Sequence, residues 1–125
     1  MKKITLQADA SIKSRIVVAE GMNTESNVGT HTLTLEDKGF HLIAGGAALI
    51  FNGDGISKGK ITDYSQAIAI NQSIGGNFTM KNIEYTAPSV RSAGILIAPR
   101  VSSAKITLDN STMNCKYYCL STNAA

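Results

Sequence analysis

The stretch that decides the fold is FTMKNIEY, residues 78–85, because it aligns without gaps with ITLDNSTM, residues 106–113. The alignment superimposes similar residues at a constant spacing of 28: Thr79 on Thr107, Met80 on Leu108, and Asn82 on Asn110. Internal repetition of this kind is the sequence signature of a repeat architecture. The stretch therefore predicts structural units that stack on one another.

A second pair of matched segments lies upstream of these two copies. QAIAINQ (66–72) precedes the first copy and AGILIAP (93–99) precedes the second. Their apolar positions recur at a spacing of 27, with Ile68 over Ile95 and Ile70 over Ile97. Strand alternation predicts that the isoleucines of the first segment point inward and its alanines outward.

Further copies extend the pattern in both directions. The tail YYCLST (117–122) fills the place of the upstream strand once more, with Cys119 and Ser121 in the two inward slots. A weaker early copy reads ALIFN (48–52) followed by GKITDY (59–64). The predicted order is strand, turn, strand and loop, repeated about every 19–28 residues.

Short strand-like runs punctuated by turn residues dominate the whole chain, apart from one doubtful helical stretch at 10–20. These runs are compatible with a sandwich, a barrel or a solenoid. Only a solenoid needs the register above, because each coil of a parallel β-helix lays its strands about 4.8 Å from their equivalents in the next coil. We therefore expect a parallel β-helix of four to five coils over 31–125, with an irregular or capping region over 1–30. Isoleucines stack inside, and asparagines stack at the bends, where their amides bond along the stack.

The bulk composition describes one domain of 125 residues with ordinary surface charge. Its net charge of +3 comes from 12 basic and 9 acidic residues spread along the chain, beside three Phe, four Tyr and no Trp. Nucleic-acid binding needs clustered basic residues with aromatics for stacking, so we do not expect it. No apolar run reaches the length of about 18 residues that a membrane span needs. The N-terminus lacks the apolar core of a signal peptide, so either the protein stays inside the cell or a leader has been removed.

Several segments resemble one family of known proteins. HTLTLEDKGFHLIAGGAALIFNGDG (31–55) resembles the "LTLDLNGHTI" opening of bacterial surface proteins with a right-handed parallel β-helix, of the pectate-lyase-like type. FTMKNIEY and ITLDNSTM look like that family's "tItnstf" coils, and KYYCLSTNAA (116–125) is similar to its "gYYGiStNg" strand. Cys119 stands where the family often has Gly, and Glu36-Asp37-Lys38 replaces its Leu-Asn-Gly. The resemblance implies an extracellular or cell-surface protein with an adhesin-like or polysaccharide-associated role, and it supplies no catalytic residue.

The CKYYC segment fits neither a redox motif nor a zinc site. A thioredoxin-like site needs CxxC at a helix N-terminus, and a zinc site needs two more ligands than Cys115 and Cys119 provide. Residues four apart in an extended strand are separated by roughly 13 Å, so a disulfide between them requires an intervening turn. We expect Cys119 to be a small apolar filler in the stack and Cys115 to lie near a bend.

Carboxylates give little sign of catalysis. Polysaccharide lyases and hydrolases built on this fold gather several carboxylates at one site. The nearest candidate is a row of Asp63, Glu84 and Asp109 on successive coils, which a solvated outer face explains equally well. FNGDG (51–55) lacks the ligand pattern of a calcium loop and is predicted to be a turn. We therefore expect no enzyme, no metal and no cofactor, and keep a polysaccharide lyase or glycoside hydrolase as the alternative.

Binding is the more plausible activity, and loops on a rigid scaffold carry function disproportionately. The candidate residues for contact with a polysaccharide, or with a host-surface glycan or protein, are Tyr85, Arg91, Arg100 and Tyr117. The chain ends as another coil begins, which predicts a fragment of a longer protein or a homodimer through an open end. The expected function is a non-catalytic, adhesin-like or glycan-contacting domain, with a self-associating structural stalk as the other alternative.

Overall fold

The computed structural model describes most of the chain. The described residues are 2–13, 16–18, 23–36, 40–42, 48–64, 68–70, 77–88, 93–97, 105–116 and 118–122. Every regular element among them is a β-strand, and the doubtful helical stretch at 10–20 contributes strands instead. The prediction of an all-β chain is confirmed.

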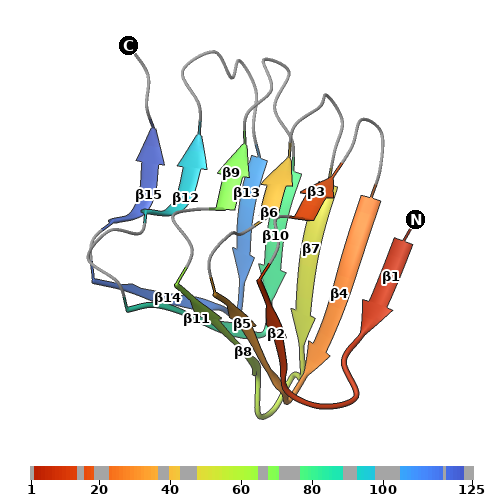
Figure 1. Cartoon of the computed structure of the whole chain (residues 1–125). Helices are drawn as coiled ribbons and strands as arrows, with labels where there is room; N and C mark the ends of the chain where they lie inside the picture. Colours follow the sequence, from red (N-terminus) through yellow and green to blue (C-terminus); the bar gives the residue numbers. More distant parts are fainter. Residues whose placement is uncertain are drawn as a thin grey trace.

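The strands form three parallel sheets of five, which we name sheets A, B and C (Figure 1). Sheet A contains, in spatial order, β1 (Lys2–Thr5), β4 (Asn23–Gly29), β7 (Ala48–Gly53), β10 (Asn77–Lys81) and β13 (Lys105–Asp109). Sheet B contains β2 (Ala10–Ile12), β5 (Thr32–Leu35), β8 (Gly59–Asp63), β11 (Ile83–Ala87) and β14 (Thr112–Cys115). Sheet C contains β3 (Ile16–Val18), β6 (Phe40–Leu42), β9 (Ile68–Ile70), β12 (Ala93–Ile97) and β15 (Tyr118–Thr122).

Each strand pairs with the strand three places along the chain, so the chain visits sheets A, B and C in turn. We call three successive strands, one in each sheet, a three-strand unit. Strands β1, β2 and β3 form the first unit at one end of the stack, and β13, β14 and β15 form the last unit at the other end (Figure 1). The predicted two-strand repeat is therefore wrong, since each unit holds three strands.

The predicted register between the matched segments is confirmed. Phe78 pairs with Ile106 and Met80 with Leu108 in sheet A. In sheet C, Ile68 pairs with Ile95 and Ile70 with Ile97, although the direction of their side chains lies outside what the structure describes. The tail is displaced by one residue from the prediction: Leu120 and Thr122, not Cys119 and Ser121, pair with Ile95 and Ile97.

The predicted asparagine stack lies at the corner between sheets A and B. Asn82 and Asn110 each occupy this corner with a left-handed backbone, at φ of 57° and 48°. Asparagine tolerates this conformation better than most residues because its short polar side chain bonds locally. The Asn110 amide donates to the Asn82 side-chain oxygen at 2.8 Å, as the stacking argument predicts. The corner also divides the run 77–85, which reads as one strand in the sequence, into β10 and β11.

The N-terminal segment is more regular than the sequence indicates. We predicted an irregular or capping region over 1–30, yet β1, β2, β3 and β4 pair in register with later strands of the same three sheets. The prediction is wrong for the described part of this segment. β4 was hidden in the sequence because its inward positions carry Thr24 and Ser26, which are buried although they are polar.

The core lies between the sheets and is built from inward positions of sheets A and B. The fully buried large side chains are Tyr85, Phe51, Phe78, Leu35, Leu49, Ile61, Met80 and Ile83. Phe51 of β7 and Phe78 of β10 lie diagonally across the inward face of sheet A, since Phe51 pairs with Met80 and Phe78 with Leu49. Their rings meet edge to face with centroids 5.7 Å apart. Such aromatic contacts contribute about 0.5–1.5 kcal/mol beyond area burial.

Candidate functional site

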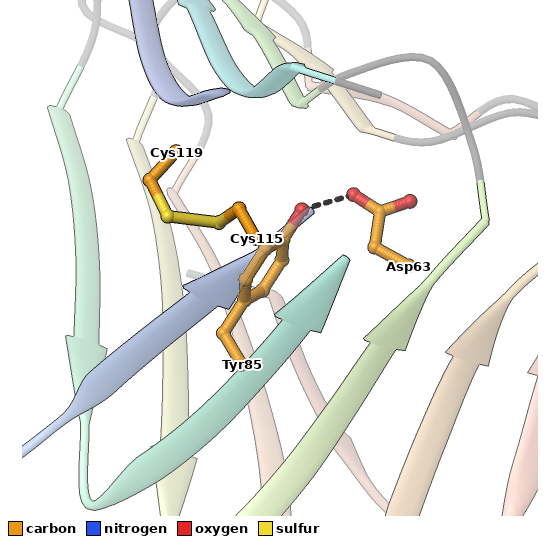
Figure 2. The surroundings of a disulfide bond; sticks show 4 residues. All are labelled: Asp63, Tyr85, Cys115 and Cys119. Atoms are coloured by element: carbon orange, nitrogen blue, oxygen red, sulfur yellow. Dashed lines mark hydrogen bonds between the residues drawn. A yellow bond between two sulfur atoms is a disulfide. The ribbon is translucent and has the colours of Figure 1, made fainter. Parts of the chain in front are cut away.

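Tyr85, predicted to contact a ligand from a loop, lies in the core. It occupies the middle of β11 and is only 1% exposed. Its hydroxyl donates to Oδ2 of Asp63, which is fully buried at the end of β8 (Figure 2). Burial raises the pKa of Tyr85, and the charge and hydrogen bond of Asp63 raise it further. The prediction that Tyr85 binds a ligand is wrong, because β11 continues through it to Ala87 and turns its ring inward.

The other three predicted contact residues, Arg91, Arg100 and Tyr117, lie outside the described residues. Their assignment to a binding surface stays a prediction.

The possible carboxylate row does not form. Asp63 points into the core at the register position of Leu35. Glu84 is exposed and pairs with Lys60 and Thr112. Asp109 belongs to sheet A, where it pairs with Lys81. Asp63 thus points inward and Glu84 outward in sheet B, whereas Asp109 lies in sheet A. The corner at Asn82 and Asn110 separates sheet A positions from sheet B positions that the sequence placed together.

The two cysteines form a disulfide, contrary to the prediction of two independent side chains (Figure 2). β14 ends at Cys115 and β15 begins at Tyr118, so the chain turns from sheet B to sheet C between them. This turn brings the Cα atoms to 5.4 Å, within the range that a disulfide needs. Cys115 packs against the core, in register with buried Ala87. The disulfide thus joins sheets B and C at one corner of the last unit.

The predicted turn over FNGDG forms only at the end of that segment, since Phe51, Asn52 and Gly53 belong to β7 and the turn runs over residues 55–57. Oδ2 of Asp54 accepts hydrogen bonds from the backbone N–H groups of Ile56 and Ser57, each at 3.0 Å. These bonds, with Ser57 contributing most, lower the pKa of Asp54. One carboxylate oxygen is therefore already used to close the turn. Within the described ranges, no group of three or more His, Cys, Asp or Glu side chains is placed to hold a metal ion.

The outer face of sheet A carries a shallow groove of about 270 Å³. Its lining comes from two neighbouring rows of residues on four adjacent strands: Asn23, Ala48, Ile50, Asn77, Thr79, Lys105 and Thr107. In the first row Asn23, Ala48, Asn77 and Lys105 follow one another in register. In the second row Ile50, Thr79 and Thr107 do the same. Alternation along each strand explains the lining, since the intervening residues face the core.

The chemistry of this groove is that of a hydrogen-bonding surface with one cation. Asn23, Asn77 and the two threonines offer amide and hydroxyl donors and acceptors, and the ammonium of Lys105 is exposed at one end. None of the lining residues is a carboxylate. The groove is smaller than the range of about 300–1,000 Å³ typical of small-molecule pockets, so it suits one segment of a longer ligand rather than an enclosed molecule.

A network of polar side chains continues the same face beside the groove. Asn52 donates to Glu25 and, at 3.3 Å, to Oδ1 of Asn27. Lys3 lies 3.9 Å from Glu25, and Asn27 donates to Thr5 across 3.5 Å. These bonds run across strands β1, β4 and β7. They link the outward side chains of neighbouring strands beside the groove.

Sequence reasoning missed the groove residues. A signal was present, because NFTMK (77–81) and KITLD (105–109) align with polar residues at their first and third positions. The same alternation in β7 and β4 was obscured by Ala48 and Ile50 and by the assignment of residues 23–29 to an irregular region. Loops of unequal length also separate these strands, so their first residues do not recur at one spacing.

Comparisons with known proteins identified no similar protein. No family model matches the sequence, and no curated protein or solved structure matches it either. The described part of the chain contains no helix with the length and apolar character needed to cross a bilayer.

Proposed function

We propose that this chain is a non-catalytic, adhesin-like domain of a bacterial surface or secreted protein that contacts glycans through the outer face of sheet A. The observation that carries the proposal is the groove, in which amides, hydroxyls and one ammonium from β4, β10 and β13 converge beside Ala48 and Ile50 of β7. Sugars are recognised by hydrogen bonds from such groups. Strands hold them more precisely than loops do.

We propose a right-handed parallel β-helix as the architecture. Every third strand stacks in parallel and in register, which supports a solenoid path. Connections between parallel strands of one sheet are right-handed in about 98% of cases, which supports the handedness. Repeated strands then present equivalent outward positions at a spacing of about 4.8 Å, which suits an extended polymer that crosses several strands.

Two further observations support the location and the absence of catalysis. The Cys115–Cys119 disulfide supports an oxidising compartment, since disulfides are rare in the cytosol. The described carboxylates supply no acid and base pair in the groove, and Asp63 is buried against Tyr85. A groove lined by amides and hydroxyls supports binding over bond cleavage, because most glycoside hydrolases need a pair of carboxylates.

Affinity electrophoresis tests this proposal. The protein is run through native gels that contain pectin, glucan, xylan or mucin, and binding to one polymer retards it. Thr79→Ala removes a hydroxyl from the groove, and Thr86→Ala is the matched control because Thr86 is an exposed mid-strand residue of β11 in sheet B. Loss of one hydrogen bond worth about 1 kcal/mol weakens binding about five-fold in the first variant and leaves the second unchanged.

The other outcomes contradict the proposal. Migration that is unchanged by every polymer argues against glycan contact. Equal weakening by both variants places the ligand elsewhere. Shortening of a polymer, measured by size-exclusion chromatography after incubation, favours the polysaccharide lyase or hydrolase alternative.

A further inference from the structure

One inward row of sheet A is buried in its middle and exposed at both ends. The row contains Ile4, Ser26, Phe51, Met80 and Leu108, each in register with the next. Its three middle members are at most 4% exposed, whereas Ile4 is 36% exposed and Leu108 is 45% exposed. The first and last strands of the stack therefore present core positions of the same row to solvent.

The two end surfaces match in one inward row of sheet A and in two inward rows of sheet B. If the stack continued beyond its last unit with another first unit, Leu108 would meet Ile4 in sheet A. In sheet B, Met113 would meet Ala10 and Cys115 would meet Ile12. All four of these sheet B residues are partly buried and already pack against the core.

The outward rows match as well. The same register sets Asp109 beside Thr5 in sheet A and Asn114 beside Ser11 in sheet B. Each pair joins a hydroxyl to a carboxylate or an amide, so both pairs are able to form hydrogen bonds. Neither pair opposes like charges. Apolar residues thus meet apolar residues in these three inward rows, whereas in the inward row of Thr24, Leu49 and Phe78 the register sets Lys2 beside Ile106. The two outward pairs are polar on both sides.

We propose that copies of this chain associate head to tail, with β13, β14 and β15 of one copy pairing in parallel with β1, β2 and β3 of the next. Each end strand has one neighbouring strand in the described sheets, and the edge of a sheet is a template for adding another strand. The occupant that fits each end is a second copy, because its opposite end continues three sheets at once with the same strand direction.

Head-to-tail contact differs from a two-fold dimer through the last unit. A two-fold axis reverses strand direction, so the three sheets of one copy do not all meet their counterparts in the other. Head-to-tail contact preserves the direction of all three sheets. It uses two different surfaces, so it does not close and gives open chains of copies.

Sedimentation velocity of the full chain, from micromolar to near-millimolar concentrations and without any glycan, measures this association. The expected result is a sedimentation coefficient that rises continuously with concentration. Leu108→Asp blocks the last unit and Ile4→Asp blocks the first, and each weakens association about a hundred-fold because an unpaired charge is buried against an apolar row. Ile56→Asp is the matched control, since Ile56 is 95% exposed in the turn after β7, away from both ends.

A mixture of the two blocked variants makes the test specific. Ile4→Asp retains a free last unit and Leu108→Asp retains a free first unit, so the mixture forms a dimer with one copy of each and stops there. Far-UV circular dichroism and titration of free thiols establish that each variant is folded with its disulfide formed. Both substitutions replace partly exposed side chains, so the fold is expected to tolerate them.

Three results overturn the proposal. One is a wild-type chain that stays monomeric at every concentration. Another is association of Ile4→Asp alone into dimers, which indicates two-fold pairing of last units. The third is equal loss of association in Ile56→Asp. Because no polymer is present, these results are independent of whether the groove on sheet A binds glycan.

Discussion

Replacement of Gly53 by alanine tests the close approach of backbones at the corner between sheets A and B. A Cβ atom on Gly53 would lie 1.9 Å from the carbonyl oxygen of Asn82 and 2.4 Å from the backbone nitrogen of Gly59. These two atoms are themselves hydrogen-bonded, with Gly59 N–H donating to Asn82 O at 2.9 Å. Because both obstacles are backbone atoms, no change of rotamer relieves the clash, and strands of adjacent units must separate.

The expected cost is the sum of two effects. Forcing an extra methyl group into packed structure costs about 1–3 kcal/mol. Losing or stretching the hydrogen bond between Gly59 and Asn82 costs about 1 kcal/mol more. We therefore expect Gly53→Ala to lower the free energy of unfolding by about 2–4 kcal/mol.

Two other glycines provide controls in the same region. Gly55→Ala adds a methyl group whose nearest neighbour is the Asn82 side-chain nitrogen at 3.8 Å, an ordinary contact, so its effect stays within about 0.5 kcal/mol. Gly29→Ala meets nothing closer than 4.0 Å, but Gly29 has a φ of +63°, which costs alanine about 1 kcal/mol.

Urea unfolding followed by far-UV circular dichroism measures these differences in the free energy of unfolding. The midpoints are compared at a constant slope of the free energy of unfolding against urea concentration. The expected order of stability is wild type and Gly55→Ala, then Gly29→Ala, then Gly53→Ala. If Gly53→Ala unfolds at the same urea concentration as Gly55→Ala, the backbones at this corner are not as close as described, and the argument is refuted.

Three further predictions concern buried or strained groups. Tyr85→Phe leaves Asp63 without its buried hydroxyl donor and lowers the free energy of unfolding by about 1–3 kcal/mol in urea. The raised pKa of Tyr85 keeps its hydroxyl protonated in the folded protein, whereas the phenol of the unfolded chain ionises near pH 10. The free energy of unfolding of the wild type therefore falls as the pH rises above about 10, by up to about 1.4 kcal/mol per pH unit. The urea midpoint of Tyr85→Phe is expected to fall less steeply over that range. The disulfide between Cys115 and Cys119 closes a loop of about five residues, so its reduction lowers the free energy of unfolding by about 2 kcal/mol. A urea midpoint that reductant leaves unchanged would contradict a formed bond. Because Asn82 has a left-handed backbone, Asn82→Ala lowers the free energy of unfolding by about 1–2 kcal/mol and Asn82→Gly lowers it less. If Asn82→Gly unfolds at a lower urea concentration than Asn82→Ala, the corner geometry is contradicted.

The sequence was informative about register because parallel stacking repeats the same chemical demand at equivalent positions. Met80 and Leu108, or Asn82 and Asn110, occupy one row each, and the row environment selects similar residues. In the inward row of Ile4, Ser26, Phe51, Met80 and Leu108, the polar Ser26 broke this similarity and hid β4. A row of stacked positions can be recognised in a sequence only where all its members have similar surroundings and therefore similar residues.

The site was predicted less well because inward and outward directions reset at each corner. An uninterrupted strand over 77–85 would turn Phe78 and Tyr85 to opposite faces, since their positions differ by an odd number. The bend at Asn82 restarts the alternation, and both residues face the core. The groove depends on four strands brought side by side across loops of unequal length, which no single segment of the sequence encodes.

The stepwise path of the chain through three sheets has a consequence for how it folds. In sheet A each strand pairs with a partner that lies between 22 and 29 residues away, as the pairs Lys2–Thr24 and Ala48–Asn77 illustrate. Loop-closure entropy depends only weakly on length in this range, so each added unit pays nearly the same entropic cost. Folding is then expected to resemble the growth of a one-dimensional crystal from the central units, where Phe51 and Phe78 meet, with the end units joining last and leaving first.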